Sequence, residues 1–305
     1  MEKRKYSVII LGGGPAGYTA ALYTSRAGLD TAIIEKLSAG GQMAETGNIE
    51  NYPGFEDGIE GFELGEKMRL GAEKFGAVSI YEEVTDVDLS SKPKRIVTSD
   101  SEYFADAVII AMGASARKLG IEKEDKFTGK GVNYCAYCDG MRYRGKDVAV
   151  IGGGDSAAED ALYLSKICTK VYLIHRRDKL RAVYSYINKL EKTENIEIIY
   201  NGELKELVGD KKLDGVNILE NGNQRHIAVD AVFAAIGRVP ETSLFLNQLE
   251  TDKTGYIKAD EMGRTNIEGV YAAGDIRTKE LRQIITAAAD GANSAKSAIE
   301  YIENL

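Results

Sequence analysis

Two cysteines stand three residues apart in the segment Cys135-Ala136-Tyr137-Cys138-Asp139. Cysteines at this spacing can close a small disulfide bond that takes up and passes on electrons by thiol–disulfide exchange. Asp139 directly follows the second cysteine, so its carboxyl group could protonate a departing thiolate, or it could cap the following turn. The segment therefore predicts a redox-active disulfide, with Cys135, Cys138 and Asp139 as candidate catalytic residues.

Zinc binding is the main alternative for this cysteine pair. A structural zinc ion normally takes four ligands, and the chain offers only Cys168, His175 and His226 as further soft candidates. No second pair of cysteines with this spacing exists, so we expect no metal site. Two inert core cysteines are another alternative. We expect Cys168, which precedes a predicted strand, to pack in the core and His226 to lie at the surface.

Glycine-rich turns occur twice, each between a predicted strand and a predicted helix. Residues 12–17 read GGGPAG after the apolar segment 7–11, and residues 152–157 read GGGDSA after 147–151. In the G-x-G-x-x-G/A fingerprint, the first glycine makes the turn and the second lets the backbone approach a pyrophosphate. The helix N-terminus then attracts the phosphates. One copy could be an ordinary turn, but two copies in matching units predict two dinucleotide sites.

The two units continue alike. Each glycine turn leads into a helix, a second strand and, later in the chain, a buried strand that ends in glycine. The fold class that this repeat predicts is α/β, with parallel sheets. The expected helices are 18–28 and 158–166, the second strands are 31–35 and 170–175, and the later strands are 106–113 and 230–237.

The residue that ends each second strand predicts which nucleotide binds there. Glu35 in the first unit would accept hydrogen bonds from ribose hydroxyls and repel a 2′-phosphate, which favours FAD or NAD. Arg176 stands at the matching place in the second unit, with Arg177 beside it and Arg181 expected one helical turn further on. Guanidinium groups bind phosphate in a bidentate manner, which favours NADPH. A solvated basic segment is the alternative.

A further strand, 269–273, runs into Gly274 and Asp275, and a helix is expected from about residue 282 to 299. Asp275 could bind a ribityl or ribose hydroxyl, while the helix N-terminus faces an anionic edge of a flavin ring. Alternatively, Asp275 is an N-cap of an ordinary helix. Together with Glu35 and the first glycine turn, the segment favours a flavin.

Composition excludes several classes of protein. The chain has 305 residues, enough for about two domains. It carries 39 Lys and Arg against 47 Asp and Glu, a net charge of −8 that argues against nucleic-acid or anionic-membrane binding. No run approaches the roughly 18 apolar residues that span a bilayer. Three cysteines do not make a secreted disulfide framework, so we expect a cytoplasmic protein.

The chain resembles low-molecular-weight bacterial thioredoxin reductases over essentially its full length. The cysteine pair ahead of the second glycine turn is the most discriminating feature. The segments that carry the resemblance are 12–17, 40–42, 46–54, 135–140, 152–160, 175–181, 272–275 and 282–291.

The resemblance implies a homodimeric flavoenzyme with two nested Rossmann-like domains. The FAD-binding domain would be discontinuous, 1–114 and 242–305, and the NADPH-binding domain, 115–241, would be inserted into it and carry the cysteines. The crossings near 114–116 and 238–240 would act as hinges. In this family the inserted domain rotates between two arrangements, one with the cysteines at the flavin and one with the nicotinamide there.

The resemblance also implies the reaction. Hydride passes from NADPH to FAD, electrons pass to the Cys135–Cys138 disulfide, and the dithiol reduces a separate protein, thioredoxin, through a mixed disulfide. Which cysteine attacks thioredoxin stays open. The alternatives are a ferredoxin-dependent flavin thioredoxin reductase, a ferredoxin–NADP reductase and a non-catalytic redox-sensing flavoprotein. The intact second glycine turn and Arg pair argue against the first, and the cysteine pair is superfluous in the second.

The family pattern, read with the two glycine turns, also indicates which residues bind the cofactors. Tyr137 departs from it, because relatives usually carry a smaller residue between the cysteines, and this bears on how a protein partner fits. The candidates for FAD are Gly12, Gly14, Pro15, Ala16, Glu35, Gly41, Gln42, Asn51, Gly113, Gly274, Asp275, Arg282 and Gln283, and those for NADPH are Gly154, Ser156, His175, Arg176, Arg177 and Arg181.

Overall fold

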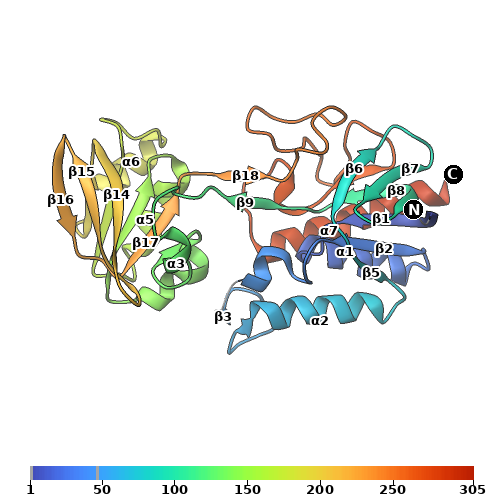
Figure 1. Ribbon diagram of the computed structural model, residues 1–305, viewed down its shortest axis with the longest axis horizontal. Coiled ribbons are helices and arrows are strands. Elements are labelled where there is room, and N and C mark those ends of the chain that lie inside the picture. The colour runs from blue at the N-terminus through green and yellow to red at the C-terminus, as the bar shows by residue number, and fades with distance from the viewer. Residues whose placement is uncertain (1–2, 46–47) are drawn as a thin grey trace. The chain divides into compact units, whose positions relative to one another are not determined.

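The computed structural model describes residues 3–45 and 48–305, and the chain forms two compact units. The first unit consists of Met1–Ser115 and Val239–Leu305, and the second of Ala116–Arg238. The chain leaves the first unit through strand β9 (Ala114–Ala116) and returns through β18 (Arg238–Pro240). These two strands pair with each other, so the two expected crossings form a short two-stranded ribbon (Figure 1).

A seven-stranded sheet forms the centre of the first unit. Its order is β5-β2-β1-β8-β7-β6, and β19 pairs with the end of β8 beyond the part that pairs with β7. Strands β1, β2, β5, β8 and β19 are parallel, and β6 and β7 are antiparallel. The bounds are β1 Lys3–Leu11, β2 Thr31–Glu35, β5 Val78–Tyr81, β6 Val84–Asp88, β7 Lys94–Thr98, β8 Glu102–Ile110 and β19 Val270–Ala272, with a separate pair, β3 Asn48–Ile49 and β4 Ile59–Glu60.

Helices α1 and α7 pack against each other beside this sheet (Figure 1). Their shared core is rich in alanine, whose small side chain lets two helices approach closely. Helix α1 begins at Pro15 rather than at 18, because proline has a preset φ and needs no hydrogen-bond acceptor at the first helical position. The elements are α1 Pro15–Arg26, α2 Gly61–Glu73, α7 Ile284–Glu303, and the short 3₁₀ turns η1 Gly41–Glu45 and η3 Gly274–Ile276.

The second unit contains a five-stranded parallel sheet of order β10-β17-β11-β12-β13 and a three-stranded antiparallel sheet of order β14-β15-β16. The strands are β10 Val132–Asn133, β11 Asp147–Gly152, β12 Lys170–Ile174, β13 Ile196–Ile199, β14 Gly202–Gly209, β15 Leu213–Glu220, β16 Asn223–Ile227 and β17 Ala231–Ala235. The helices are α3 Glu124–Phe127, α4 Ala136–Asp139, α5 Asp155–Leu164, α6 Tyr184–Glu191 and the 3₁₀ turn η2 Gly140–Tyr143.

Alternating side chains of β11 pack in two different hydrophobic cores, one on each face of the sheet. Val148 and Val150 pack with helix α5, while Ala149 packs with residues of the three-stranded sheet. Both faces of the parallel sheet are therefore covered, which explains why its strands are continuous apolar runs. His226 is exposed as expected, although it lies within β16.

Both units carry a parallel sheet with a strand, a glycine turn, a helix and a second strand in sequence, so the predicted α/β class is confirmed. Of the helices in the described parts of the chain, none combines the length and apolar character that crossing a membrane requires.

Candidate redox site and nucleotide-binding turns

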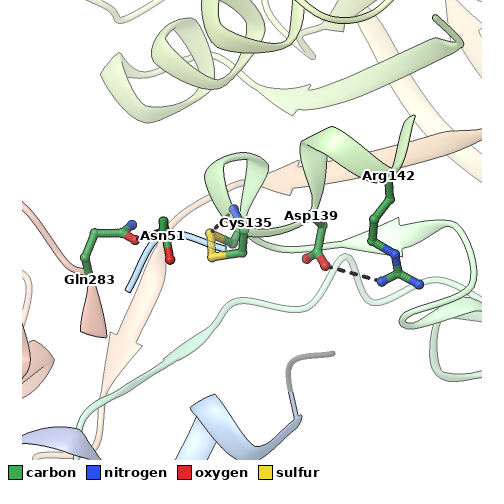
Figure 2. The surroundings of a disulfide bond; sticks show 6 residues. Asn51, Cys135, Asp139, Arg142 and Gln283 are labelled. Atoms are coloured by element: carbon green, nitrogen blue, oxygen red, sulfur yellow. Dashed lines mark hydrogen bonds and ion pairs between the residues drawn. A yellow bond between two sulfur atoms is a disulfide. The ribbon is translucent and has the colours of Figure 1, made fainter. Parts of the chain in front are cut away.

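Cys135 and Cys138 form a disulfide bond around the single turn of helix α4 (Figure 2). Cys135 is the N-cap of this turn, and its Sγ accepts a hydrogen bond from the Cys138 amide at 3.2 Å. Both cysteines are half-buried, and neither belongs to a hydrophobic core. This arrangement fits a redox-active disulfide and contradicts the alternative of two inert core cysteines.

Cys168 behaves as a core residue. It is 6% exposed and lies in the core of the second unit, with its Sγ 3.4 Å from the carbonyl oxygen of Tyr143. Burial raises the pKa of the Cys168 thiol to about 11. A thiol with that pKa stays protonated near neutral pH and is a poor nucleophile, so the expected packing role is confirmed.

The Asp139 carboxyl group lies beside the disulfide and forms an ion pair with Arg142 at 3.4 Å (Figure 2). Its side chain is 20% exposed, and this burial raises its pKa, against the lowering effect of Arg142. Asp139 precedes the turn η2, but its side chain makes no capping hydrogen bond there. The capping alternative is therefore wrong, and a carboxyl group that holds its proton more readily suits an acid.

Tyr137 has a defined place despite its size. Its ring stacks on that of Tyr163 in helix α5, with centroids 4.4 Å apart and an interplanar angle of 29°. The side chain remains 49% exposed. The larger residue between the cysteines is thus accommodated by an aromatic stack that links α4 to α5.

The first glycine turn is closed by Glu35. The Gly13 amide donates a hydrogen bond to Glu35 Oε2 at 2.7 Å, while Oε1 accepts from the amides of Lys36 and Leu37 at 2.8 and 3.2 Å. Gly12 has φ +102°, and a Cβ atom there would lie 2.6 Å from the Ala111 carbonyl oxygen, so only glycine fits. The carboxylate at the end of β2 is thereby fixed at the turn.

Candidate residues from distant parts of the chain gather at the start of α1. A Cβ atom on Gly41 would lie 3.5 Å from Gly14 Cα, and one on Gly274 would lie 3.0 Å from Ala16 Cβ. Gly14 is the N-cap of α1, and no side chain of the described residues makes a capping hydrogen bond there. A Cβ atom on Gly14 would meet no atom of the described residues within 4 Å. Because an uncapped helix N-terminus with room around it suits a phosphate group, this end of α1 fits a dinucleotide.

Other candidate residues for FAD are tied to the same unit by hydrogen bonds. Asn51 Nδ2 donates to Gln283 Oε1 at 3.0 Å (Figure 2), and Gln42 Nε2 donates to the Ala114 carbonyl at 2.7 Å. Gly113 has φ +73°, and its carbonyl accepts from the Glu241 amide at 3.1 Å. Thr46 and Gly47, the first two residues of segment 46–54, lie outside the described residues.

Helix α7 begins with a capping box rather than with Asp275. At its N-terminus, the side chain of Gln283 accepts a hydrogen bond from the Thr286 amide, and the side chain of Thr286 accepts one from the Gln283 amide. Asp275 lies inside the turn η3. The alternative that Asp275 is an N-cap is therefore wrong. Next to this box, the Arg282 guanidinium lies over the Tyr256 ring at 4.1 Å, and its Nε atom is buried with no hydrogen-bond partner among the described residues. Such an orphaned donor fits a site whose ligand supplies the acceptor.

The structure also shows a buried ion cluster that the sequence did not reveal. Asp290 of α7 accepts hydrogen bonds from Arg277 at 2.9 Å, from Lys279 at 2.8 Å and from the Gly274 amide at 3.0 Å. The three charged side chains are at most 8% exposed. The cluster fixes the turn that carries Asp275. The sequence signal for this cluster was a single acidic residue, Asp290, among the small alanine and glycine residues of this helix.

His175, not Arg176, has at the second glycine turn the place that Glu35 has at the first, so the expectation that Arg176 matches Glu35 is wrong. A Cβ atom on Gly153 would lie 2.1 Å from His175 Nδ1, so the imidazole ring occupies the space above this glycine. Burial lowers the pKa of His175, which keeps the ring neutral. Its Nε2 atom is buried and has no hydrogen-bond partner in the described parts of the chain. Gly154 is the N-cap of α5 and, like Gly14, has no side-chain capping hydrogen bond. Ser156, the second residue of α5, is exposed.

The expectation that Arg181 lies one helical turn beyond Arg177 is wrong. Residues 175–183 form no helix, and α6 begins only at Tyr184. The Arg181 amide donates to the Gly153 carbonyl at 2.6 Å, and the Arg177 carbonyl accepts from the Asn201 amide at 3.0 Å. Backbone bonds to other segments thus replace the intrahelical ones. Arg176, Arg177 and Arg181 are all exposed, and a cluster of this kind fits a phosphate group.

Comparison with known proteins agrees with this geometry. The family described as pyridine nucleotide-disulphide oxidoreductase matches residues 6–291. The chain is 47% identical to the thioredoxin reductase of Listeria monocytogenes, over 100% of this chain and 96% of that protein. It is 44% identical to that of Bacillus subtilis, over 100% of this chain and 97% of that protein.

Among solved structures, the thioredoxin reductase from Streptococcus pyogenes covers 99% of both chains with 41% identity and a TM-score of 0.91. Sequence and structure therefore give the same answer over the full length. The chain belongs to the pyridine nucleotide-disulphide oxidoreductase family, and within it to the thioredoxin reductases.

Proposed function

We propose that this chain is an NADPH-dependent, FAD-containing thioredoxin-disulfide reductase. The observation that carries the proposal is the Cys135–Cys138 disulfide, which lies in the same unit as the second glycine turn and its exposed arginines. Bound NADPH and FAD supply two electrons that reduce this disulfide. The resulting dithiol reduces the disulfide of a separate thioredoxin by thiol–disulfide exchange.

The first unit holds FAD in this proposal. Gly12, Gly14, Pro15 and Ala16 form the turn against the pyrophosphate, and Glu35 accepts hydrogen bonds from the adenosine ribose. The orphaned Nε of Arg282 supports a ligand acceptor near the start of α7. The remaining FAD contacts come from Gly41, Gln42, Asn51, Gly113, Gly274, Asp275 and Gln283.

The second unit holds NADPH. Gly154 and Ser156 lie at the uncapped start of α5 and receive the pyrophosphate. Arg176, Arg177 and Arg181 bind the 2′-phosphate of the adenosine ribose. The neutral His175 ring, packed on Gly153, offers a buried Nε2 atom to the nucleotide. This set of donors supports NADPH over NADH.

Asp139 is the general acid of the thiol chemistry. Its burial next to the disulfide supports a carboxyl group that keeps a proton for a leaving thiolate. Of the cysteines, either Cys135 or Cys138 is the one that attacks thioredoxin.

We propose further that residues 1–114 with 242–305 act as the FAD-binding domain and residues 115–241 as the NADPH-binding domain. The two compact units, whose bounds differ from these by at most three residues, support this division. The paired strands β9 and β18 are then the hinge about which the inserted domain rotates. Two chains associate as a homodimer, and the enzyme works in the cytoplasm.

The test is an anaerobic titration of the yellow protein. We expect NADPH to bleach the visible absorbance of the flavin rapidly and NADH to do so slowly. Oxidised thioredoxin should then restore the colour of the wild type. Cys138→Ser should be yellow as purified, because it retains FAD, but thioredoxin should not restore its colour once NADPH has bleached it. Bleaching by neither nucleotide would reject the NADPH site and favour a ferredoxin-type donor, while bleaching without recolouring by thioredoxin would favour a redox-sensing flavoprotein.

A further inference from the structure

Arg142 contacts the proposed general acid Asp139 but has no role in the function proposed above. Arg142 lies on the turn η2, directly after helix α4. Its Nη1 is 3.4 Å from Asp139 Oδ1, and its Nη2 donates to the Gly129 carbonyl at 3.5 Å. The guanidinium group thus bridges the carboxyl group beside the disulfide and a loop of the same unit. Figure 2 shows the Arg142 side chain extended toward Asp139.

We propose that Arg142 is a positioning residue for the acid step, whose positive charge next to the Asp139 carboxyl group limits the pH range over which that group holds its proton. The proposal rests on the assignment of Asp139 as the general acid. In this role Arg142 changes the pH at which Asp139 loses its proton and does not contact a cofactor.

The charged surroundings of Asp139 are simple. Burial raises its pKa, and Arg142 is the only charged group among the described residues that acts against this. The acidic residues of the neighbouring helix α5, Glu159 and Asp160, raise the pKa of Tyr137 and do not act on Asp139. The cysteines titrate once the disulfide is reduced, and they do so in the wild type and in every variant at Arg142 or Arg144. The effect of Arg142 on Asp139 is therefore the difference between the Arg142 variant and the matched control.

The proton balance of the exchange defines what Asp139 must do. An enzyme thiolate attacks one sulfur of the thioredoxin disulfide, so a mixed disulfide forms and the thioredoxin S–S bond breaks. The leaving thioredoxin thiolate takes the Asp139 proton. The second enzyme thiol then passes its proton to the Asp139 carboxylate and attacks the mixed disulfide. This restores the Cys135–Cys138 disulfide and releases reduced thioredoxin, whose second sulfur takes the last proton from Asp139 or water.

The sign of the effect follows from the geometry. Without the positive charge of Arg142, the buried carboxyl group would hold its proton up to a higher pH. The alkaline limb of the exchange rate, where Asp139 loses its proton, should move upward with it. An ion pair with one exposed partner, here Arg142, contributes only a small free energy, so we expect a shift of about half a pH unit and, on the alkaline side, about a threefold faster exchange.

The experiment uses the full-length holoenzyme, reduced and then mixed rapidly with oxidised thioredoxin across a range of pH. The titration midpoint of Asp139 is measured separately by infrared difference spectroscopy, with Asp139→Asn identifying its carboxyl band. Arg142→Met is the test variant and Arg142→Lys the conservative rescue. The matched control is Arg144→Met, because Arg144 is exposed two residues away and forms no ion pair with any described residue.

We expect Arg142→Met to raise both the infrared midpoint and the alkaline limb, while Arg142→Lys and Arg144→Met leave both near the wild-type values. An unchanged midpoint in Arg142→Met would overturn the proposal, and the proposed function would stand if Asp139→Asn still slowed exchange. Wild-type exchange and an unaltered pH profile in Asp139→Asn would overturn the acid assignment and this proposal with it. Failure of the wild-type enzyme to reduce thioredoxin would reject the proposed function itself.

Discussion

The amide of Gly13 and the carboxylate of Glu35 are joined by a hydrogen bond of 2.7 Å, although 22 residues separate them. The glycine turn and the end of the second strand are thereby one rigid feature. In the second unit, the His175 ring packs against Gly153 at the same topological place. Each unit thus fixes its glycine turn through a residue at the end of its second strand. Glu35, the last residue of β2, does so by a hydrogen bond, and His175, the residue directly after β12, does so by close packing.

Glu35→Ala should weaken FAD binding. The substitution removes the acceptor of the Gly13 amide and, by the proposed assignment, a ribose contact. Hydrogen bonds to a charged group are worth about 1.5–3 kcal/mol, so we expect the dissociation constant for FAD to rise about tenfold or more. Fluorescence titration of the apoprotein with FAD measures it. Glu83→Gln is the control, because Glu83 pairs with Lys36 at the surface. Unaltered FAD affinity in Glu35→Ala would reject the assignment.

Replacing Arg176 and Arg177 together by alanine should change nucleotide preference. Both side chains are exposed, and their proposed partner is the 2′-phosphate, which NADH lacks. We expect the KM for NADPH to rise about tenfold or more, since each charged hydrogen bond contributes about 1.5–3 kcal/mol, and that for NADH to change little. Steady-state kinetics with both nucleotides decides the matter, with Lys179→Ala as the control in the same exposed segment. Equal increases for both nucleotides would contradict a 2′-phosphate site.

Thiol counting should separate the three cysteines. After reduction by NADPH, Cys135 and Cys138 should react quickly with a thiol reagent, because both are half-buried at most. Cys168 should react only after unfolding, since it is 6% exposed and burial raises its pKa to about 11. We therefore expect two fast thiols in the native enzyme and a third in denaturant. In Cys168→Ala the count should be two in both states, and a third fast thiol in the native wild type would disprove the core assignment.

The sequence predicted those features that depend on local pattern. Apolar runs such as 147–151 became buried parallel strands, and the spacing of Cys135 and Cys138 sufficed for a disulfide within one helical turn. Features that depend on contacts between distant segments were not predictable. The segment 175–183 lacks a helix because its backbone bonds go to other loops. The Asn51–Gln283 bond joins residues 232 positions apart, which no local pattern could indicate.

The buried ion cluster shows the same limit more clearly. Asp290 looks like a surface residue of a helix when only the sequence is considered, because charged side chains are rarely buried. In the structure, burial alone would raise its pKa, but hydrogen bonds from Arg277 and Lys279 outweigh that and lower it. The pairing depends on how α7 is rotated about its axis relative to the turn η3. That rotation is decided by packing against α1, not by the residues near Asp290.

Asp160 should make the stability of the second unit depend on pH. Burial in helix α5 raises its pKa to about 7, the Glu159 charge adds to this, and Arg238 opposes it. In the unfolded state the pKa of an aspartic acid is about 3.9, lower than in this folded state. The free energy of unfolding therefore decreases as the pH rises from about 4 to 7, and it stays at the lower value above pH 7. Asp160→Asn has no such loss. We therefore expect its Tm to exceed that of the wild type by a few degrees at pH 8, and the difference to shrink toward pH 5, by scanning calorimetry. Glu122→Gln, which removes the same charge from an exposed position, should show no such trend, and parallel pH profiles for Asp160→Asn and the wild type would refute the burial argument.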